Sequence, residues 1–334
     1  MMRVLRIHGA GDLRLSAEAE PAVAEGEQLV RVTAVGICGS DLHYLEDGGI
    51  GTARVERPLV LGHEFAGTVR TDAGVRIMAV DPAIPCGSCV HCLDGDPNLC
   101  EHVRFSGHPG DDGALRELMP WPSECLFPLP EGMTAADGAM LEPLGVAIHA
   151  VDLGKVLPGT SVGVYGCGPI GLLTMQVARA AGATTIVATD PLDHRLDAAR
   201  RFGADVVIKA RDGAEAADVI DAAAGGVDIA FEAAGTHEAV DVAVESARPG
   251  ARVILIGIPS EDHTTFRAST ARRKGLTVKW ARRMKHTYPR AIELVRTGRV
   301  DVRSLVTHTF PIDRFQDAFD VAMRREGLKV VIEP

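Results

Sequence analysis

The chain has 334 residues, of which 46% are hydrophobic and 24% are charged, and its formal net charge at pH 7 is −10. This length exceeds what one hydrophobic core usually organises and is typical of two domains. The negative net charge argues against nucleic acid or an anionic membrane surface as the main partner. The basic stretch at residues 272–285 is a local exception to this balance.

The N-terminal residues alternate like a β-strand and lack the long apolar core and cleavage site of an export signal. Residues 156–178 carry no charge over 23 positions, which is long enough to cross a bilayer. Glycines and prolines interrupt this stretch where a strand should turn into a helix, so a membrane span is the less favoured interpretation. We expect a cytoplasmic protein whose seven cysteines stay reduced.

The first 140 residues are rich in turns and contain short apolar runs, such as residues 28–35 and 58–69, which predicts an irregular, mostly β domain. From residue 158 apolar strands alternate with helical segments, which predicts βαβ units and a parallel sheet covered on both faces. The predicted strands are 161–168, 184–190, 204–210, 227–235 and 251–258, and the helices between them are 169–182, 194–203, 215–226 and 237–250. The last fifty residues hold a predicted helix, 288–298, and a final strand, 328–334, and should return to the first domain.

A glycine-rich turn joins the first of these strands to its helix. Gly166, Gly168 and Gly171 have the G-x-G-x-x-G spacing, with Pro169 and Ile170 between the last two. Such a turn admits the pyrophosphate of a dinucleotide close to the backbone and presents the free N–H groups of a helix N-terminus to it. The pattern predicts a dinucleotide-binding site.

The second strand ends in Asp190, nineteen residues after Gly171. A carboxylate there accepts hydrogen bonds from the adenosine ribose and repels a 2′-phosphate, which favours NAD over NADP. Arg195 is a nearby cation that could tolerate a 2′-phosphate, so NADP remains the alternative.

Four cysteines crowd one short segment, at positions Cys86, Cys89, Cys92 and Cys100. Four thiolates in such a loop fit a closed tetrahedral zinc site, which stabilises the fold and leaves no position open for a substrate. The alternative is an iron–sulfur cluster, but its usual motif continues after three residues with Cys-Pro, whereas here seven residues intervene and Glu101 follows. The spacing favours structural zinc.

Other candidate ligands are scattered. Cys38 lies in ICGSDLHY, His63 and Glu64 lie in LGHEF, and Glu142 lies in EPLGVAIHA. Each has an ordinary structural interpretation when taken singly, because buried free cysteine is common and most glutamates are solvated. Spacing alone does not join these residues into one site.

Read in order, ICGSDLHY, PLVLGHEFAGTV, the four-cysteine segment, EPLGVAIHA and YGCGPIGLL resemble the zinc-dependent medium-chain dehydrogenases. The chain is most similar to the polyol branch, the sorbitol and L-idonate dehydrogenases, through GGIGTARVERPLVLGHE, GDDGALREL and SLVTHTFPIDRFQDAF. The resemblance implies an α/β protein with a GroES-like, mostly β catalytic domain at 1–146 and 284–334. It also implies a Rossmann NAD-binding domain at 147–283, with the active site between the two.

The resemblance also assigns metal ligands. Cys38, His63 and Glu64 would hold a catalytic zinc, and Glu142 would be a fourth ligand or an acid that anchors the zinc-bound water. Asp41 would be the carboxylate that orients His63. With the structural zinc, this gives two zinc ions per chain.

The same resemblance implies the groups that handle the proton and the substrate. Ser40 would accept the proton of the substrate hydroxyl and His43 would pass it onward. Tyr44 and Phe105 are candidates for the wall of the substrate site, and both could equally be core residues. Arg283 is the candidate contact for a cofactor phosphate or a substrate carboxylate, although the residues after it differ from the sorbitol dehydrogenase pattern. Residues 71–79 are several positions shorter than usual, which predicts a trimmed surface turn.

The expected function is therefore oxidation of a secondary hydroxyl of a polyol, sugar acid or cyclitol to a ketone, with zinc and NAD, by a homodimer or homotetramer. An L-threonine-type dehydrogenase is the alternative within enzymes, because it shares C-G-[ST]-D and GHEFAG. A non-catalytic zinc- and dinucleotide-binding regulator is a third possibility, which the intact Cys38, Ser40, His63 and Glu64 disfavour.

Overall fold

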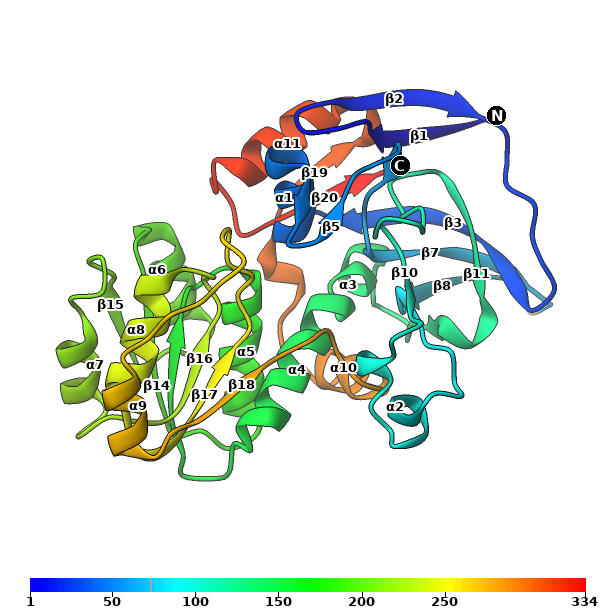
Figure 1. The fold of residues 1–334 in the computed structure, drawn as a ribbon. Coiled ribbons are helices and arrows are strands. Elements are labelled where there is room, and N and C mark those ends of the chain that lie inside the picture. The colour runs from blue at the N-terminus through cyan, green and yellow to red at the C-terminus, as the bar shows by residue number, and fades with distance from the viewer. Residues whose placement is uncertain (73) are drawn as a thin grey trace. The chain divides into compact units, whose positions relative to one another are not determined.

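The computed structural model describes residues 1–72 and 74–334, which form two compact units. The first unit comprises Met1–Glu142, Tyr288–Arg296 and Val302–Pro334. The second comprises Pro143–Thr287 and Thr297–Asp301. Figure 1 draws both units as a ribbon and labels many of their elements.

The first unit is built on a seven-stranded sheet in the order β12-β8-β7-β3-β20-β19, with β11 paired to β3. Its pairs are antiparallel except β19 with β20, which run parallel. The strands are β3 (Glu27–Gly36), β7 (Glu64–Thr71), β8 (Gly74–Val80), β11 (Leu118–Pro122), β12 (Leu126–Pro128), β19 (Val306–Pro311) and β20 (Lys329–Glu333). The turn between β7 and β8, where the sequence predicts trimming, includes Ala73, which lies outside the described residues.

Smaller sheets complete the β structure of this unit. The strand order is β2-β1-β6 in one of them, and β10-β9 and β4-β5 are two-stranded. Their bounds are β1 (Met2–Ile7), β2 (Leu13–Glu18), β4 (Gly49–Ile50), β5 (Ala53–Arg54), β6 (Leu59–Val60), β9 (Ala83–Ile84) and β10 (Arg104–Phe105). The predicted mostly β character of this region is confirmed.

Short helices connect these strands. They are α1 (Gly39–Asp47), α2 (Val90–Leu93), α3 (Ala135–Ala139), α10 (Tyr288–Arg296) and α11 (Phe315–Met323), with 3₁₀ turns at η1 (Pro97–Leu99), η2 (Ser123–Cys125), η3 (Arg303–Leu305) and η4 (Ile312–Arg314). Apolar side chains from the sheets and from α11 form one core, in which the rings of Phe65 and Trp121 meet edge-to-face with centroids 6.3 Å apart. Burial of this core fixes the ends of β3 and β7, where the candidate ligands lie.

The second unit contains a six-stranded parallel sheet in the order β15-β14-β13-β16-β17-β18. Numbered from its first strand, this order is 3-2-1-4-5-6, the dinucleotide-binding order of doubly wound sheets. The strands are β13 (Ser161–Tyr165), β14 (Thr185–Asp190), β15 (Val206–Lys209), β16 (Val227–Glu232), β17 (Ala247–Leu255) and β18 (Thr277–Trp280). From β13 to β15 successive strands are added toward one edge of the sheet, and from β16 to β18 toward the other, so the strand order reverses between β13 and β16.

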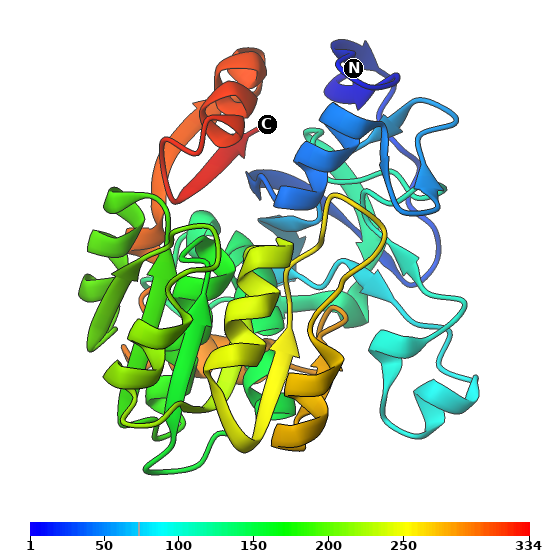
Figure 2. The same cartoon turned by 60° about the vertical axis from the view of Figure 1, so that its left-hand side comes forward.

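Helices flank this sheet, as Figure 2 shows. They are α4 (Leu141–Gly154), whose first two residues belong to the first unit, α5 (Pro169–Ala180), α6 (Asp193–Arg201), α7 (Ala216–Ala222), α8 (His237–Ser246) and α9 (Ala268–Lys274). The predicted α/β class, with a mostly β unit and a unit built on a doubly wound parallel sheet, is confirmed.

One detail differs from the sequence-based expectation. Residues 247–250, predicted as the end of a helix, lie in β17, because α8 ends at Ser246 ahead of Pro249, which has no amide hydrogen to continue a helix. Residues 156–178 form β13, the glycine turn and most of α5. Among the residues that the structure describes, no helix has both the length and the apolar character that a membrane span requires.

Candidate functional site

Cys38, His63 and Glu64 come together in the first unit. Each offers one ligand atom, and these atoms all lie within 4.8 Å of one another. His63 and Glu64 are buried and Cys38 is partly buried. Thiol, imidazole and carboxylate are the donors that zinc prefers, so the three residues could hold a zinc ion.

The local fold brings these residues to one place. Cys38 is the N-cap of α1, directly after β3, and Glu64 is the first residue of β7. The two strands pair antiparallel with Gly36 opposite Glu64, so the end of one strand lies beside the start of the other. This strand pairing is the long-range contact that the spacing of the sequence could not supply.

Asp41 links the segments that carry the candidate ligands. Its carboxylate accepts hydrogen bonds from the backbone N–H of Cys38 at 2.9 Å and of Gly62 at 3.3 Å. Its Oδ1 lies 3.8 Å from His63 Nδ1, which is an ion-pair distance and too long for a hydrogen bond. In this structure Asp41 therefore positions the backbone on both sides of the cluster.

Lys329 is a buried cation that the sequence analysis did not single out. It is the first residue of β20, and its Nζ forms an ion pair with Glu64 Oε2, with both side chains almost fully buried. Both side chains pack against Gly36, and a Cβ there would lie 2.2 Å from Glu64 Oε2 and 2.9 Å from Lys329 Cε. In the sequence, the sign of this buried cation is a single lysine at the start of the apolar strand LKVVIEP.

Electrostatics make this cluster suited to a cation. Burial raises the pKa of the Cys38 thiol to about 12, and the charge of Glu64 adds to the effect. Burial raises the pKa of Glu142 to about 8, although His63 opposes this, and burial also raises the pKa of Asp41. Anionic forms are costly here without a compensating charge, and a divalent metal would stabilise them.

Glu142 is buried in the first turn of α4, close enough for Glu64 and Cys38 to raise its pKa. It is not in the group whose ligand atoms lie within 4.8 Å of one another.

Helix α1 carries the candidate proton-handling residues. Ser40 lies within hydrogen-bonding reach of the Cys38 sulfur and lowers the pKa of that thiol. His43 Nδ1 lies 3.2 Å from Asp47 Oδ2 one turn further along the helix. Tyr44 is 5% exposed and packs in the core, which favours its structural interpretation. The Phe105 ring lies 5.4 Å from the His63 ring, beside the candidate ligands.

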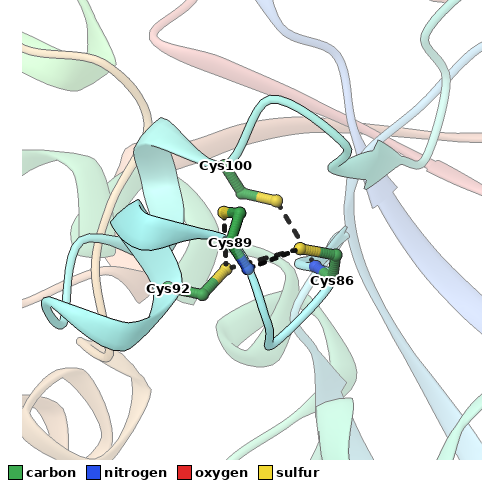
Figure 3. A group of neighbouring side chains, drawn as sticks. All are labelled: Cys86, Cys89, Cys92 and Cys100. Carbon is green, nitrogen blue, oxygen red and sulfur yellow. Dashed lines mark hydrogen bonds between the residues drawn. The ribbon is translucent and has the colours of Figure 1, made fainter.

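The four-cysteine segment folds back on itself, and Figure 3 shows its sulfur atoms pointing toward one another. Sγ of Cys92 lies 3.5 Å from that of Cys89 and 4.0 Å from that of Cys86. Tetrahedral zinc with four thiolates separates its sulfurs by about 3.8 Å, so the observed distances bracket that value. The cysteines are free of disulfides.

Backbone groups favour thiolate in this segment. Hydrogen bonds from the Ser88 and Cys89 backbone lower the pKa of Cys86 to about 6, whereas burial raises the pKa of Cys92 to about 12. The segment could hold a metal with all four positions filled by protein.

In the second unit the glycine turn lies at the carboxyl end of β13. Gly166 has a φ of 100°, and a Cβ on Gly171 would lie 1.9 Å from the Gly166 oxygen. Gly168 is the N-cap of α5 and Pro169 is its first residue, where a missing N–H costs nothing. Ile170 follows in the first turn. The turn leaves the helix N-terminus available to an anion.

Asp190 ends β14 and is buried. Its Oδ2 accepts from the Cys167 N–H at 2.8 Å and its Oδ1 from the Leu192 N–H at 2.9 Å, so each oxygen keeps a lone pair for a further donor. Arg195 lies in the first turns of α6, near Gly168. Arg283 also belongs to the second unit and has a φ of 52°, a conformation that non-glycine residues seldom adopt.

Comparison with known families agrees with this arrangement. A family model described as "Alcohol dehydrogenase GroES-like domain" matches residues 24–131, and one described as "Zinc-binding dehydrogenase" matches residues 169–297. Sorbitol dehydrogenase from Bacillus subtilis is 34% identical over 345 residues, covering 100% of this chain and 97% of that protein. L-idonate 5-dehydrogenase from Vitis vinifera is 34% identical, covering 95% and 90%.

Solved structures share the whole fold. An alcohol dehydrogenase from Escherichia coli CFT073 in complex with NADH is 27% identical, with a TM-score of 0.91 and coverage of 100% and 99%. A structure from Sinorhizobium meliloti 1021 in the zinc-binding dehydrogenase class, bound to NADP, is 30% identical, with a TM-score of 0.90 and coverage of 100% and 99%. The chain belongs to the zinc-dependent medium-chain dehydrogenases, in their polyol dehydrogenase branch. It is a zinc-containing dehydrogenase.

Proposed function

We propose that this enzyme oxidises a secondary hydroxyl of a polyol, sugar acid or cyclitol to a ketone, with NAD as the hydride acceptor. The observation that carries the proposal is the convergence of Cys38, His63 and Glu64, with ligand atoms within 4.8 Å of one another, in a chain of this family. These residues fit a catalytic zinc. The first unit would then be the catalytic domain and the second the cofactor domain.

When bound, zinc would lower the pKa of the substrate hydroxyl and the nicotinamide would accept the hydride. Ser40 lies in the first turn of α1, two residues after Cys38, and would receive the hydroxyl proton. His43 follows on the same helix and would pass this proton toward solvent, and its Nδ1 lies 3.2 Å from Asp47 Oδ2. Asp41 and Lys329 would hold Cys38 and Glu64 in position, and buried Glu142 would anchor a water or complete the ligand set. Phe105 would line the site, and Tyr44 and Arg283 remain candidate substrate contacts.

In the second unit, the turn Gly166–Gly171 would hold the pyrophosphate against the N-terminus of α5. Asp190 would accept hydrogen bonds from the adenosine ribose, and its charge would disfavour a 2′-phosphate. Relatives of this fold are known with NADH and with NADP, so the preference rests on Asp190 against Arg195.

A second zinc on Cys86, Cys89, Cys92 and Cys100 would stabilise the segment without taking part in the reaction. A homodimer or homotetramer remains a prediction from the family resemblance, and a cytoplasmic location remains a prediction from the sequence.

The proposal is tested by initial rates of NADH or NADPH formation, measured for each substrate with NAD and with NADP. The substrates are sorbitol, xylitol, L-idonate, galactitol, myo-inositol, L-threonine and ethanol. A rate on a polyol, sugar acid or cyclitol that is higher with NAD than with NADP is the expected result. A rate on L-threonine alone would transfer the assignment to the threonine-type reaction. No rate on any substrate from zinc-loaded protein would refute the proposed substrate class.

A further inference from the structure

A third group of metal-binding side chains lies in the second unit, outside the two cysteine-containing groups. His237 Nε2 lies 3.6 Å from Glu261 Oε2, and His263 Nε2 lies 3.3 Å from the same oxygen. The two imidazole rings are 5.1 Å apart, and one ligand atom from each of the three residues lies within 4.8 Å of the others. The three polar ends thus converge on one point.

The spacing matches that of a metal site. Zinc bonds to histidine nitrogen and carboxylate oxygen are about 2.0–2.1 Å long, so the ligand atoms of a tetrahedral site lie about 3.3 Å apart. The two distances to Glu261 agree with this value to within a few tenths of an ångström. Two histidines and one glutamate are also a known zinc ligand set.

A rigid backbone carries these residues. β16 and β17 are parallel neighbours with Glu232 opposite Leu255, so the loops after both strands leave the same edge of the sheet. The Glu232 side chain accepts from the N–H groups of Ala234 and Gly235, at 2.7 and 2.6 Å. Its carbonyl accepts from the N–H groups of Ile256 and Gly257 at 2.8 and 3.1 Å. Glu232 therefore ties together the two loops that lead to His237 and to Glu261.

These loops are also in direct contact. A Cβ on Gly257 would lie 2.2 Å from the Gly235 nitrogen, and a Cβ on Gly235 would lie 2.4 Å from the Ile258 oxygen. The glycines permit this close approach, which fixes the starting points of the two ligand-bearing segments.

His237 is held at the start of a helix, and its Nε2 is the ring nitrogen on the side of Glu261. It is the first residue of α8, whose N-cap Thr236 accepts from the Ala239 N–H at 3.3 Å. The Nδ1 of His237 is buried and has no hydrogen-bond partner in the described part of the chain.

The Glu261 carboxylate is also available to bind a metal ion. Across residues 1–72 and 74–334, the ion-pair partners of its carboxylate are the two histidines, and neither lysine nor arginine pairs with it. Glu261 and His263 are 64% and 61% exposed at their side chains, so an ion can reach them from solvent.

We propose that His237, Glu261 and His263 form a binding site for a divalent transition-metal ion, with zinc as its representative. The ion would join the loop of residues 257–267 to the first turn of α8, at the carboxyl edge of the sheet. Solvent would complete its coordination, so this ion would exchange more readily than one held by four cysteines.

Calorimetric titration of the full chain with zinc chloride, after dialysis into zinc-free buffer, tests the site. We compare the wild type with the double variant His237→Gln/His263→Gln, with Glu261→Gln, and with His194→Gln, an exposed histidine of α6 in the same unit. The wild type and His194→Gln should bind one equivalent more than the double variant, and Glu261→Gln should weaken that equivalent about tenfold or more. The difference between variants does not depend on how many other zinc sites are filled.

Hydrogen exchange gives a second readout, independent of activity. Zinc should slow amide exchange in residues 257–267 of the wild type and of His194→Gln but not of the double variant. Exchange elsewhere without zinc verifies that each variant is folded. The proposal is overturned if the double variant takes up as many equivalents as the wild type with the same affinity, or if zinc leaves exchange in 257–267 unchanged.

Discussion

At the scale of single residues, the buried pair of Glu64 and Lys329 defines the surroundings of the proposed catalytic zinc. Removing both charges from water is costly, and the pair persists because each charge compensates the other. Gly36 is required between them, because any side chain there would meet both. One lysine in a buried strand was the only sign of this arrangement in the sequence.

Lys329→Met should therefore destabilise the protein by about 3–5 kcal/mol, because it leaves Glu64 buried without its partner. Glu64→Gln in the same chain should restore a large part of the loss, since no unpaired charge remains. Urea unfolding in EDTA, where a bound metal cannot contribute, measures both effects.

The exposed pair of Arg200 and Asp197 is the matched control, and Arg200→Met should change stability by less than about 0.5 kcal/mol. Wild-type stability in Lys329→Met would contradict the structural role of the pair.

Alanine substitutions at two glycines of the turn 166–171 should separate an effect on stability from an effect on NAD affinity. Gly171→Ala places a Cβ 1.9 Å from the Gly166 oxygen and should cost about 1–3 kcal/mol of stability as well as NAD affinity. A Cβ on Gly168 meets only Arg195, at 3.7 Å, so Gly168→Ala should stay as stable as the wild type. It should lose NAD affinity about tenfold or more, because its methyl group would enter the space that we propose for the pyrophosphate. Thermal unfolding and NADH fluorescence titration measure the two quantities. Equal stability of both variants would refute the packing role of Gly171.

At the scale of elements, the segment of residues 86–100 cannot be held by apolar burial. Its regular structure is one four-residue helix and one 3₁₀ turn, and Val90, Leu93 and Leu99 are 62%, 74% and 41% exposed. A metal on the four cysteines would supply the missing stability.

Cys89→Ser should accordingly lower the zinc content by one equivalent and accelerate amide exchange in residues 84–102. NAD affinity should stay unchanged, because the glycine turn belongs to the other unit. Leu93→Ala, at an exposed position of the same segment, is the control. Unchanged exchange in Cys89→Ser would mean that the segment is stable without a metal.

At the start of helix α3, Asp137 makes contacts whose contribution to stability should depend on pH. Thr134 and Asp137 form a capping box, and Arg303 donates to Asp137 Oδ1 at 3.1 Å. Burial raises the pKa of Asp137, but the hydrogen bonds from Arg303 and Thr134 outweigh it, so the pKa is lowered overall.

A carboxylate with a lowered folded-state pKa contributes stability above its unfolded pKa and loses it as the pH falls through the folded pKa. Asp137→Asn should therefore reduce stability at pH 7 and weaken its decline between about pH 5 and pH 2. Urea unfolding across this range measures the slope, with exposed Asp47→Asn as the control. Parallel curves for Asp137→Asn and the wild type would contradict the prediction.

At the scale of the whole molecule, the sequence predicts what depends on local periodicity. The alternation after residue 158 gave the β13–β17 succession, and the glycine spacing placed the turn between β13 and α5. In the C-terminal region the sequence predicted α10 and β20 but not β19 or α11. The strand β19 alternates between half-buried and exposed residues and has no continuous apolar run to reveal it.

Contacts between distant segments could not be predicted from spacing. Cys38 and Glu64 meet because β3 pairs with β7, and the family resemblance alone had linked them. The group of His237, Glu261 and His263 depends on two loops that Glu232 holds together, and no motif in the sequence marks it.

The most direct test of the central claim compares zinc-loaded wild type with Cys38→Ser on the best polyol substrate. Both the rate of NADH formation and the zinc content per chain are measured. The account predicts that Cys38→Ser loses at least about a thousandfold in rate and one equivalent of zinc, while keeping the zinc of the four cysteines and binding NAD normally. A variant that retains the wild-type rate would show that the reaction does not take place at Cys38, His63 and Glu64.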